Sequence, residues 1–469
     1  MRYKNVLFFS MEDLNDWIGP LKGHPDCHTP NLDRFATNAR VFERAYTEAP
    51  ACSPSRTAML FSTHPWTSGI LHNDLNWYDF FQHGKSQSLI SQFKQNGFET
   101  LGWGKVFHSR FERHSLDLTD WDRFTFQDGD EFPLSSKVAK AKHFRKRSDF
   151  GVDPTGKPTS DDLNAQSFID TVKPQDEGKF WGFGTFRPHL PFFARQEFFD
   201  KIPQDVALPK GLRSETFDPT DRSVLKGLPA SARKMALQFS QNGIDLADCG
   251  EYNDFLRSYL ACIAYADHIF GKIIDHLEAC GLIESTLIVF YSDHGWQLGE
   301  KLAFRKFTLW ERALRVPLMI AGAGIEAGPS KTPVSLTDLG PTLLSLMNIP
   351  TPASFSGVDL SKHLTQNQPI DREFIASLWG TDFETNNPKI AYSLRSRRYR
   401  ITRYWDETYE LYDHKYDPFE HKNLANKPQK PVFQRHKEAI DAFYKDAESK
   451  RPNTQVSEYS KALRAKVKG

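Results

Sequence analysis

The stretch around Cys52 combines a thiol, a proline and an arginine in a pattern that suits the start of a helix. Pro54 fits the first helical turn, where its missing N–H costs nothing, and Ser53 is a candidate N-cap. Arg56 lies one turn further and is expected to reach back toward the Cys52 side chain. A thiol at a helix N-terminus beside a guanidinium lies where negative charge is stabilised, so Cys52 is a candidate nucleophile. The alternative is a buried structural cysteine, the commoner role of a single Cys.

Acidic residues follow two continuous apolar runs that are typical of strands buried on both faces. The first run, residues 5–10, leads to Glu12 and Asp13, and the second, residues 286–292, leads to Asp293. Ligands of open α/β sheets collect at the carboxyl ends of strands, so we expect these carboxylates to surround one cation. Carboxylate oxygens favour Ca²⁺ or Mg²⁺ over zinc. The alternative is a pair of acidic loops in solvent.

His189 has the chemistry of a proton donor near neutral pH. It lies between Pro188 and Pro191, which restrict the backbone around it. Imidazole is well suited to sharing a proton with a leaving alkoxide. A structural histidine with satisfied hydrogen bonds is the alternative.

The pentapeptide from Cys52 to Arg56, Cys-Ser-Pro-Ser-Arg, matches the signature of the type I sulfatases. The resemblance implies that a separate maturation enzyme oxidises Cys52 to formylglycine, whose hydrated aldehyde attacks the sulfur of a sulfate ester. It also implies a bound calcium ion and positive charge around the sulfate, with Arg56 steadying the nucleophile.

Two further segments resemble the iduronate-2-sulfatase-like branch of that family, and a third feature matches the family as a whole. Gly-Lys-Val-Phe-His ends at His108, and the resemblance implies that Lys105 binds the sulfate while His108 lies beside the nucleophile. One helical turn places these two side chains over the same spot. Arg-Pro-His-Leu-Pro-Phe supports His189 as the acid that protonates the leaving group, although its arginine replaces the more usual lysine. Lys306 stands thirteen residues beyond Asp293, which matches the spacing of the family's second sulfate-binding lysine.

The metal ligands that the resemblance implies are Glu12, Asp13, Asp293, His294 and the converted side chain of Cys52. Glu12 stands where the family normally has an aspartate, and its extra methylene pushes the carboxylate deeper or shifts the cation. Asp13 is therefore the stronger candidate of the two. His294 stands where many other sulfatases use asparagine, although a hard cation prefers oxygen ligands.

Buried strands alternate with helical patterns along most of the chain, which is typical of a largely parallel sheet. The clearest helix carries an apolar stripe from Phe255 to Leu277 and stops at Gly281. With the resemblance, these patterns predict an α/β fold like that of alkaline phosphatase, with a large, mostly parallel sheet sandwiched by helices in a catalytic domain over residues 1–370. Alternating segments further on predict a C-terminal subdomain over residues 371–469, with a small antiparallel sheet and a helix.

Three local features accompany this architecture. Residues 40–46 are expected to form one strand. Residues 109–176 are expected to form an insertion packed on the outside. Residues 450–469 are expected to form a mobile tail or a docking helix.

Composition excludes several classes of function. With 469 residues the chain is long enough for a large core and two folding units, and its net charge of +1 argues against nucleic-acid binding by bulk charge. No apolar run approaches the ~20 residues of a membrane span. Because the N-terminus leads directly into an expected strand, we expect a cytoplasmic protein, or a periplasmic or secreted one if a leader has been removed. The 5 cysteines lack paired spacing, so no disulfide framework is indicated.

The sequence therefore predicts a calcium-dependent sulfatase that acts on a sulfated sugar, with Trp77, Trp181 and Trp296 as aromatic surfaces for it. Uronate, galactose and small esters such as choline sulfate all stay open as substrates. A phosphonate monoester or phosphodiester hydrolase is an alternative, because it shares the Cys-x-Pro-x-Arg motif and the metal site, although Lys105 and His108 favour the sulfatase. A glycan-binding relative that has lost activity is the third interpretation.

Overall fold

The computed structural model describes residues 3–75, 77, 87–108, 120–125, 150–153, 155–213, 215–383 and 388–452. Much of the expected insertion over residues 109–176 and most of the expected tail over residues 450–469 lie outside these residues.

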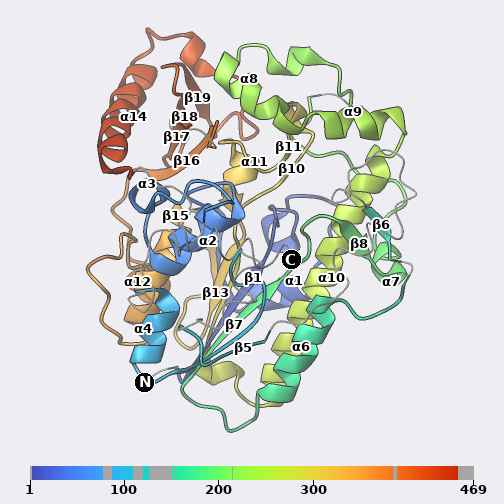
Figure 1. Cartoon of the computed structure of the whole chain (residues 1–469), viewed down its shortest axis with the longest axis vertical. Helices are drawn as coiled ribbons and strands as arrows, with labels where there is room; N and C mark the ends of the chain where they lie inside the picture. Colours follow the sequence, from blue (N-terminus) through green and yellow to red (C-terminus); the bar gives the residue numbers. More distant parts are fainter. Residues whose placement is uncertain are drawn as a thin grey trace, which may run out of the picture.

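A large sheet runs through the centre of the molecule (Figure 1). It has eight strands in the order β14-β2-β13-β9-β1-β7-β4-β5. Their bounds are β1 (Asn5–Met11), β2 (Ala39–Phe42), β4 (Glu99–Gly104), β5 (Arg123–Thr125), β7 (Lys179–Thr185), β9 (Thr286–Ser292), β13 (Leu318–Ala321) and β14 (Gly328–Ser330). Strands β5, β4, β7, β1 and β9 run parallel, and β13 pairs antiparallel with both β9 and β2. The mostly parallel sheet that the sequence predicts is confirmed.

Helices cover both faces of this sheet (Figure 1). One face packs against α1 (Pro30–Ala36), α6 (Ser160–Thr171) and α10 (Tyr252–Ala279), and the other against α2 (Cys52–Phe61), α4 (Leu89–Gln95) and α12 (Leu339–Leu346). Side chains of β1 alternate between the two resulting cores: Leu7 and Phe9 belong to the first, Val6 and Phe8 to the second. Because neither face meets water, β1 reads as an unbroken apolar run.

Smaller sheets flank the large one. β3 (Ala45–Tyr46) lies between β12 (Arg315–Val316) and β15 (Val334–Ser335), β6 (Phe150–Val152) pairs with β8 (Phe192–Ala194), and β10 (Gln297–Leu298) pairs with β11 (Phe304–Arg305). The single strand expected over residues 40–46 is wrong. Polar Glu43 and Arg44 form a turn after β2, and β3 then joins a different sheet.

The C-terminal region forms a four-stranded antiparallel sheet of β16 (Ile375–Thr381), β17 (Lys389–Arg395), β18 (Tyr399–Arg403) and β19 (Tyr409–Asp413). Helix α14 (Pro431–Lys450) covers it (Figure 1). The predicted small sheet with a packed helix is therefore confirmed, whereas the domain boundary near residue 370 stays a prediction. The remaining described α-helices are α3 (Pro65–Ser68), α7 (Gln196–Phe199), α8 (Ala230–Ala236), α9 (Gln241–Asp248), α11 (Glu311–Leu314) and α13 (Ser361–Gln366).

The three tryptophans expected to meet a sugar are buried instead. Trp77 is 5%, Trp181 0% and Trp296 2% exposed. Trp181 lies on β7, in the middle of the sheet, where both faces are covered by helices. This prediction is wrong, because aromatic residues at strand positions fill the core before they serve a surface.

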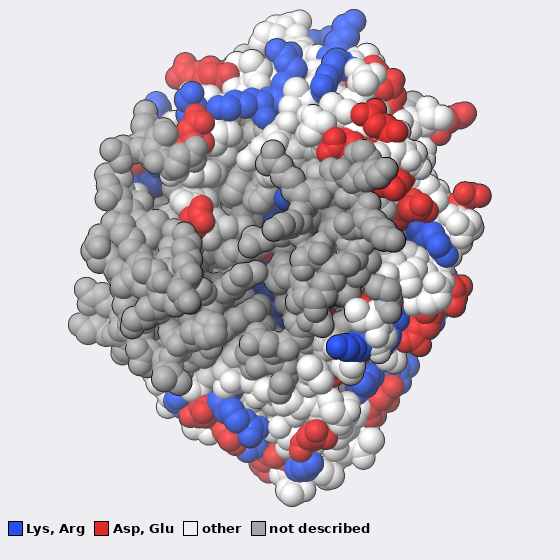
Figure 2. All heavy atoms as spheres, turned by 45° about the vertical axis from the view of Figure 1, so that its right-hand side comes forward, with Lys and Arg blue, Asp and Glu red and all other residues white. Residues whose placement is uncertain are grey.

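The described surface carries charges of both signs. On the face drawn in Figure 2, acidic and basic side chains are interspersed around the described part. None of the helices in the described ranges combines the length and the apolar character that crossing a membrane requires.

Candidate active site

The two acid-bearing loops meet because their strands are neighbours. β1 and β9 pair in parallel with Met11 opposite Ser292, so the residues that follow leave the same edge of the sheet. The backbone N–H of Asp13 donates to Asp293 Oδ1 at 3.2 Å. Asp13 has a φ of 56°, in the left-handed region that Asp tolerates better than most residues. The expected meeting of the two strand ends is confirmed.

The conformation of Asp13 is held from the long helix α10. The hydroxyl of Tyr259 donates to the Asp13 carbonyl at 2.7 Å and accepts from the N–H of Asn15 at 3.1 Å. The apolar stripe in the sequence of this helix identified Tyr259 only as a core residue. A hydroxyl within a buried stripe needs a hydrogen-bond partner, and that is the signal that could have drawn attention to it.

Helix α2 begins at Cys52 and places Pro54 in its first turn, as predicted. Its N-cap is Ala51, which offers no side-chain cap, so the expected N-cap role of Ser53 is wrong. The hydroxyl of Ser53 donates instead to the Leu75 carbonyl at 2.5 Å.

Arg56 does not turn back toward the Cys52 sulfur as expected. Its Nε donates to Asp293 Oδ2 at 3.0 Å, and its Nη1 donates to the carbonyls of Lys105 and Val106 at 2.8 and 2.9 Å. The side chain is 2% exposed. Arg56 therefore ties helix α2 to the ends of β9 and β4, and so holds three segments of the site together.

The core of the site is a cluster around the Cys52 sulfur. Lys306 Nζ lies 2.9 Å from Cys52 Sγ and 2.7 Å from Asp13 Oδ1. His294 Nε2 lies 3.3 Å from Cys52 Sγ, 3.3 Å from Asp13 Oδ1 and 3.5 Å from Asp293 Oδ2. All five side chains are buried. The structure thus brings Cys52, Asp13, Asp293, His294 and Lys306 into one cluster.

The other predicted residues border this cluster on the Glu12 side. Lys105 forms an ion pair with Glu12, and the ligand atoms of Glu12, Cys52 and His108 lie within 4.8 Å of one another. His189 Nε2 lies 3.7 Å from Asp13 Oδ2, and its Nδ1 lies 2.5 Å from the Leu190 carbonyl. Lys105 and His108 therefore meet at one place, but residues 105–108 form bends rather than the expected helical turn.

Burial governs the protonation of the thiol and the imidazoles. It raises the pKa of the Cys52 thiol well above its ordinary value, although Lys306 acts in the opposite direction. The encoded cysteine is therefore a neutral thiol at neutral pH, and the helix start does not make it a thiolate. Burial also lowers the pKa of His189 to about 3 and lowers the pKa of His294 and His108. Neutral imidazoles keep a lone pair for a proton or a cation.

Among the acids, burial and neighbouring charge act against each other. Burial raises the pKa of Glu12, but the charge of Lys105 and those of Arg56 and Lys306 outweigh it, so this pKa lies well below its ordinary value. The pKa of Asp293 is also lowered, because His294 and Arg56 oppose the effect of burial. Both carboxyls are therefore ionised at neutral pH.

The carboxylates fit a divalent cation. Glu12 Oε1 and Asp13 Oδ2 are buried and accept no hydrogen bond from a described residue. Such oxygens are costly to bury without a positive partner, and oxygen-rich clusters suit Ca²⁺ or Mg²⁺. The ligand atoms of Asp13, Cys52 and His294 lie within 4.8 Å of one another, which matches the span of one coordination sphere.

Comparisons with known proteins agree on one family. A family model described as Sulfatase matches residues 4–349, and one described as N-sulphoglucosamine sulphohydrolase, C-terminal, matches residues 299–445. A sulfatase of Formosa agariphila is 29% identical over 90% of this chain and 83% of its own length. The iduronate 2-sulfatase of Mus musculus is 26% identical over 85% of this chain and 84% of its own length.

The fold is shared with solved structures. A protein solved in complex with its substrate D-glucosamine-2-N,6-O-disulfate superposes with a TM-score of 0.74 at 19% identity, covering 96% of this chain and 99% of that one. The predicted large mostly parallel sheet with a C-terminal antiparallel sheet is thus the architecture of solved relatives as well.

Proposed function

Because this chain belongs to the sulfatase family, we propose that it hydrolyses a sulfate ester on a sulfated sugar or polysaccharide fragment, with a formylglycine made from Cys52 as the nucleophile and a bound calcium ion. Family membership makes the chain a sulfuric ester hydrolase. Support for a sugar comes from the relatives, which include an iduronate 2-sulfatase and a protein whose substrate is a glucosamine disulfate.

One observation carries the proposal. The nucleophile candidate Cys52 contacts a lysine at 2.9 Å and a histidine at 3.3 Å, and both of these also contact Asp13. A nucleophile, cationic groups and a carboxylate-lined cation site are what attack on a tetrahedral anion requires.

Five residues would hold the calcium ion: Glu12, Asp13, Asp293, His294 and the converted residue 52. When bound, the ion withdraws electron density from the sulfate oxygens, and the converted side chain supplies the attacking hydroxyl. The site accommodates Glu12 because its carboxylate is stabilised by Lys105, so this longer acid lies between the cation site and a cation of the protein itself.

The remaining side chains bind charge and move protons. Lys306 lies next to residue 52 and Lys105 next to Glu12, so the two ammonium groups approach a bound sulfate from different segments and neutralise its oxygens. Arg56 holds Asp293 and helix α2 in place. His108, beside Cys52, accepts a proton from that side chain.

His189 is the proposed donor of the proton to the leaving oxygen. Because burial lowers the pKa of this imidazole to about 3, we infer that it is neutral when the site holds no substrate. A bound sulfate ester places negative charge beside it, which raises the pKa of the imidazole and lets it carry the proton.

The test is release of inorganic sulfate by protein co-expressed with a formylglycine-generating enzyme. A panel of sulfated oligosaccharides and a phosphodiester analogue serve as substrates, and C52A is the control. We expect sulfate release from at least one sulfated sugar, none from C52A, and a formylglycine in the peptide that contains residue 52 by mass spectrometry.

Two other results would replace the proposal. Turnover of the phosphodiester in preference to every sulfate ester would make the chain a phosphodiester or phosphonate monoester hydrolase. An unconverted thiol, together with glycan binding and no turnover, would make it a glycan-binding relative.

A further inference from the structure

Lys306 follows a hairpin whose own strand pairing is too short to fix its conformation. β10 and β11 pair through only two residues on each strand, Gln297 with Arg305 and Leu298 with Phe304. Arg305 and Phe307, on either side of Lys306, have φ values of 70° and 74°, which are strained for side chains of this size. Contacts from outside the hairpin must therefore hold the lysine where it meets Cys52.

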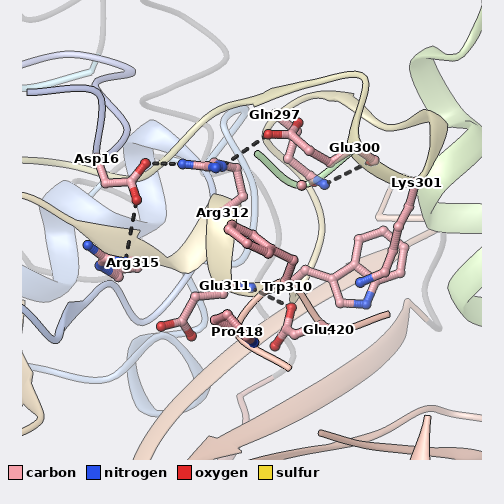
Figure 3. Close-up of a pocket in the computed structure, with 12 residues that line it drawn as sticks. Asp16, Gln297, Glu300, Lys301, Trp310, Glu311, Arg312, Arg315, Pro418 and Glu420 are labelled. Carbon is pink, nitrogen blue, oxygen red and sulfur yellow. Dashed lines mark hydrogen bonds and ion pairs between the residues drawn. The ribbon is translucent and has the colours of Figure 1, made fainter. Parts of the chain in front are cut away.

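The tip of the hairpin, between β10 and β11, is fastened on one side through Glu300. Its carboxylate accepts from the N–H of Leu298 at 2.7 Å and from Arg312 Nε at 3.0 Å. Arg312 also pairs with Asp16, on the loop that follows β1 (Figure 3). These bonds connect Glu300 to the loop that carries Asp13, but they leave the next residue, Lys301, without a similar anchor.

The tip of the hairpin is held by Lys301. Figure 3 shows its side chain lying along the indole of Trp310. The Nζ atom lies 4.3 Å from the centroid of that ring system and 5.0 Å from the ring of Tyr412. The residue is 7% exposed, and its ammonium makes no hydrogen bond or ion pair with a described residue. It is therefore held by the two ring faces and by the charges of the nearby Glu420 and Glu410.

A pocket beside the tip increases the importance of this contact. It is a partly open pocket of about 50 Å³, lined by Lys301, Trp310, Glu420 and other residues (Figure 3). On that side Lys301 therefore borders open space as well as packed side chains. Backbone strain also increases the need for contacts that hold this segment, since Lys301 and Leu302 both have positive φ, 52° and 59°.

The two rings belong to the C-terminal sheet or are bonded to it. Tyr412 lies on β19, and Glu410 of the same strand accepts from the Tyr412 hydroxyl at 2.5 Å and from Trp310 Nε1 at 2.8 Å. On the other side of Lys306, Phe307 stacks on Trp379 of β16 with 5.1 Å between centroids. The C-terminal sheet thus contacts the hairpin before and after the catalytic lysine.

We propose that Lys301 is a positioning residue for Lys306: its ammonium on the faces of Trp310 and Tyr412 fixes the hairpin tip and so lets the C-terminal sheet set the position of the lysine at the nucleophile. The inference rests on the proposed function, in which Lys306 binds the sulfate. The competing explanation is a purely structural cation that stabilises the junction with the C-terminal sheet.

The first experiment does not depend on activity. Amide hydrogen exchange is compared between the wild type and K301M, which keeps the length of the apolar stem and removes the charge. We expect exchange in peptides covering residues 297–307 to rise about tenfold, with the strands of the large sheet unchanged. K437M is the matched control, because Lys437 lies 5.1 Å from the ring of Tyr409 at a place remote from the hairpin.

The second experiment is a double-mutant cycle on kcat/KM, measured well below the unfolding midpoint of every variant. We expect K301M to lower kcat/KM about tenfold in the wild-type background and less than twofold in the K306A background. The effect should nearly vanish in K306A because Lys301 acts by positioning Lys306. K301R, which keeps a cation on the rings, restores most of the loss. If K301M does not fold, Y412L makes the same comparison by removing one ring and keeping the charge.

The outcomes separate this inference from the proposed function. An equal loss in both backgrounds, or unchanged exchange in the hairpin, would show a purely structural role and overturn it. Absence of sulfatase activity in the wild type would overturn the proposed function, while the exchange experiment would still decide whether Lys301 holds the hairpin.

Discussion

Two buried clusters of acids and bases in this molecule differ in whether their carboxylate oxygens already have donors. In the cluster around the Cys52 sulfur, called the catalytic cluster below, the ligand atoms of Asp13, Cys52 and His294 lie within 4.8 Å of one another. The same holds for a second cluster, formed by Glu311, His414 and Glu420. By proximity alone, either could hold a cation. Only the first is left with buried acceptors that no described residue satisfies.

The second cluster is satisfied by the protein itself. Glu311 accepts from the Tyr46 hydroxyl at 2.8 Å and from Arg395 Nε at 3.1 Å, and it pairs with Arg400. Glu420 lies 2.8 Å from Arg400 Nε and 3.1 Å from His414 Nε2, and its other oxygen accepts from the Glu311 N–H at 2.8 Å. Because the arginines already neutralise these carboxylates, a metal ion is not needed here. The hydrogen bonds of this cluster join α11 to the C-terminal sheet.

The contrast shows that the number of nearby ligand atoms is a weaker guide to a metal site than whether those atoms already accept hydrogen bonds from the protein. A buried carboxylate that lacks hydrogen-bond donors is stabilised by a bound cation, whereas one that faces two guanidinium groups is already neutralised and has a structural role. Four experiments break or sharpen this distinction.

The largest effect is expected for D13N. This variant removes a negative charge from the catalytic cluster, and we expect kcat/KM to fall more than about 10³-fold, equivalent to about 4 kcal/mol. Calcium should also lose its ability to raise the unfolding midpoint, which a thermal melt with and without calcium measures. A full calcium response in D13N would contradict the assignment of the catalytic cluster as the metal site.

E420Q should act on stability instead. Removing this charge leaves Arg400 and His414 with Glu311 as the only carboxylate of the cluster, so we expect the free energy of unfolding to fall by about 3 kcal/mol in urea titrations. The calcium response should be the same as in the wild type. Loss of that response in E420Q would place the metal at the second cluster.

The pH dependence of stability should reflect Glu420 in a predictable direction. Although burial raises the pKa of this carboxyl, His414 and Arg400 outweigh it and lower the pKa to about 2. Its stabilising effect is therefore complete above the unfolded pKa near 4.5 and is lost as the pH falls toward 2, with about 2 kcal/mol gone by pH 3. Urea titrations at pH 6 and pH 3 should show that E420Q loses less stability over this interval than the wild type.

The smallest effect is expected for Y259F, which removes the hydroxyl that holds the backbone of Asp13. We expect kcat/KM at saturating calcium to fall about tenfold, or about 1.4 kcal/mol, because one donor to a buried carbonyl is lost. Y265F, on the same helix but bonded to Thr159, is the matched control and should keep its activity. Equal losses in both variants would mean that α10 acts only through general stability.

The sequence allowed prediction of the features that hydrophobic pattern controls. The two apolar runs that became β1 and β9 could be recognised without a structure, and neighbouring parallel strands bring Asp13 and Asp293 to one edge. The long stripe of α10 was equally clear. The assignment of individual residues within the site came largely from the resemblance to a known family.

Side-chain partners that depend on distant segments could not be predicted. Ser53 bonds the Leu75 carbonyl rather than capping α2, since tertiary contacts compete with local ones. The helical turn expected at Lys105 is absent, and the carbonyls of Lys105 and Val106 accept instead from Arg56, a partner on a distant segment. Lys301 carried no signal, because its partners Trp310 and Tyr412 meet it only through the packing of the C-terminal sheet.

If Cys52 is converted to formylglycine as proposed, the burial of helix α2 restricts when the conversion can occur. All ten residues from Cys52 to Phe61 are buried, and Cys52 itself is 0% exposed. An enzyme that modifies this thiol can therefore reach it only while the chain is still emerging or unfolded. On that proposal, we expect a maturation enzyme added to the purified, folded protein to leave Cys52 unconverted, which mass spectrometry of the peptide containing residue 52 would check.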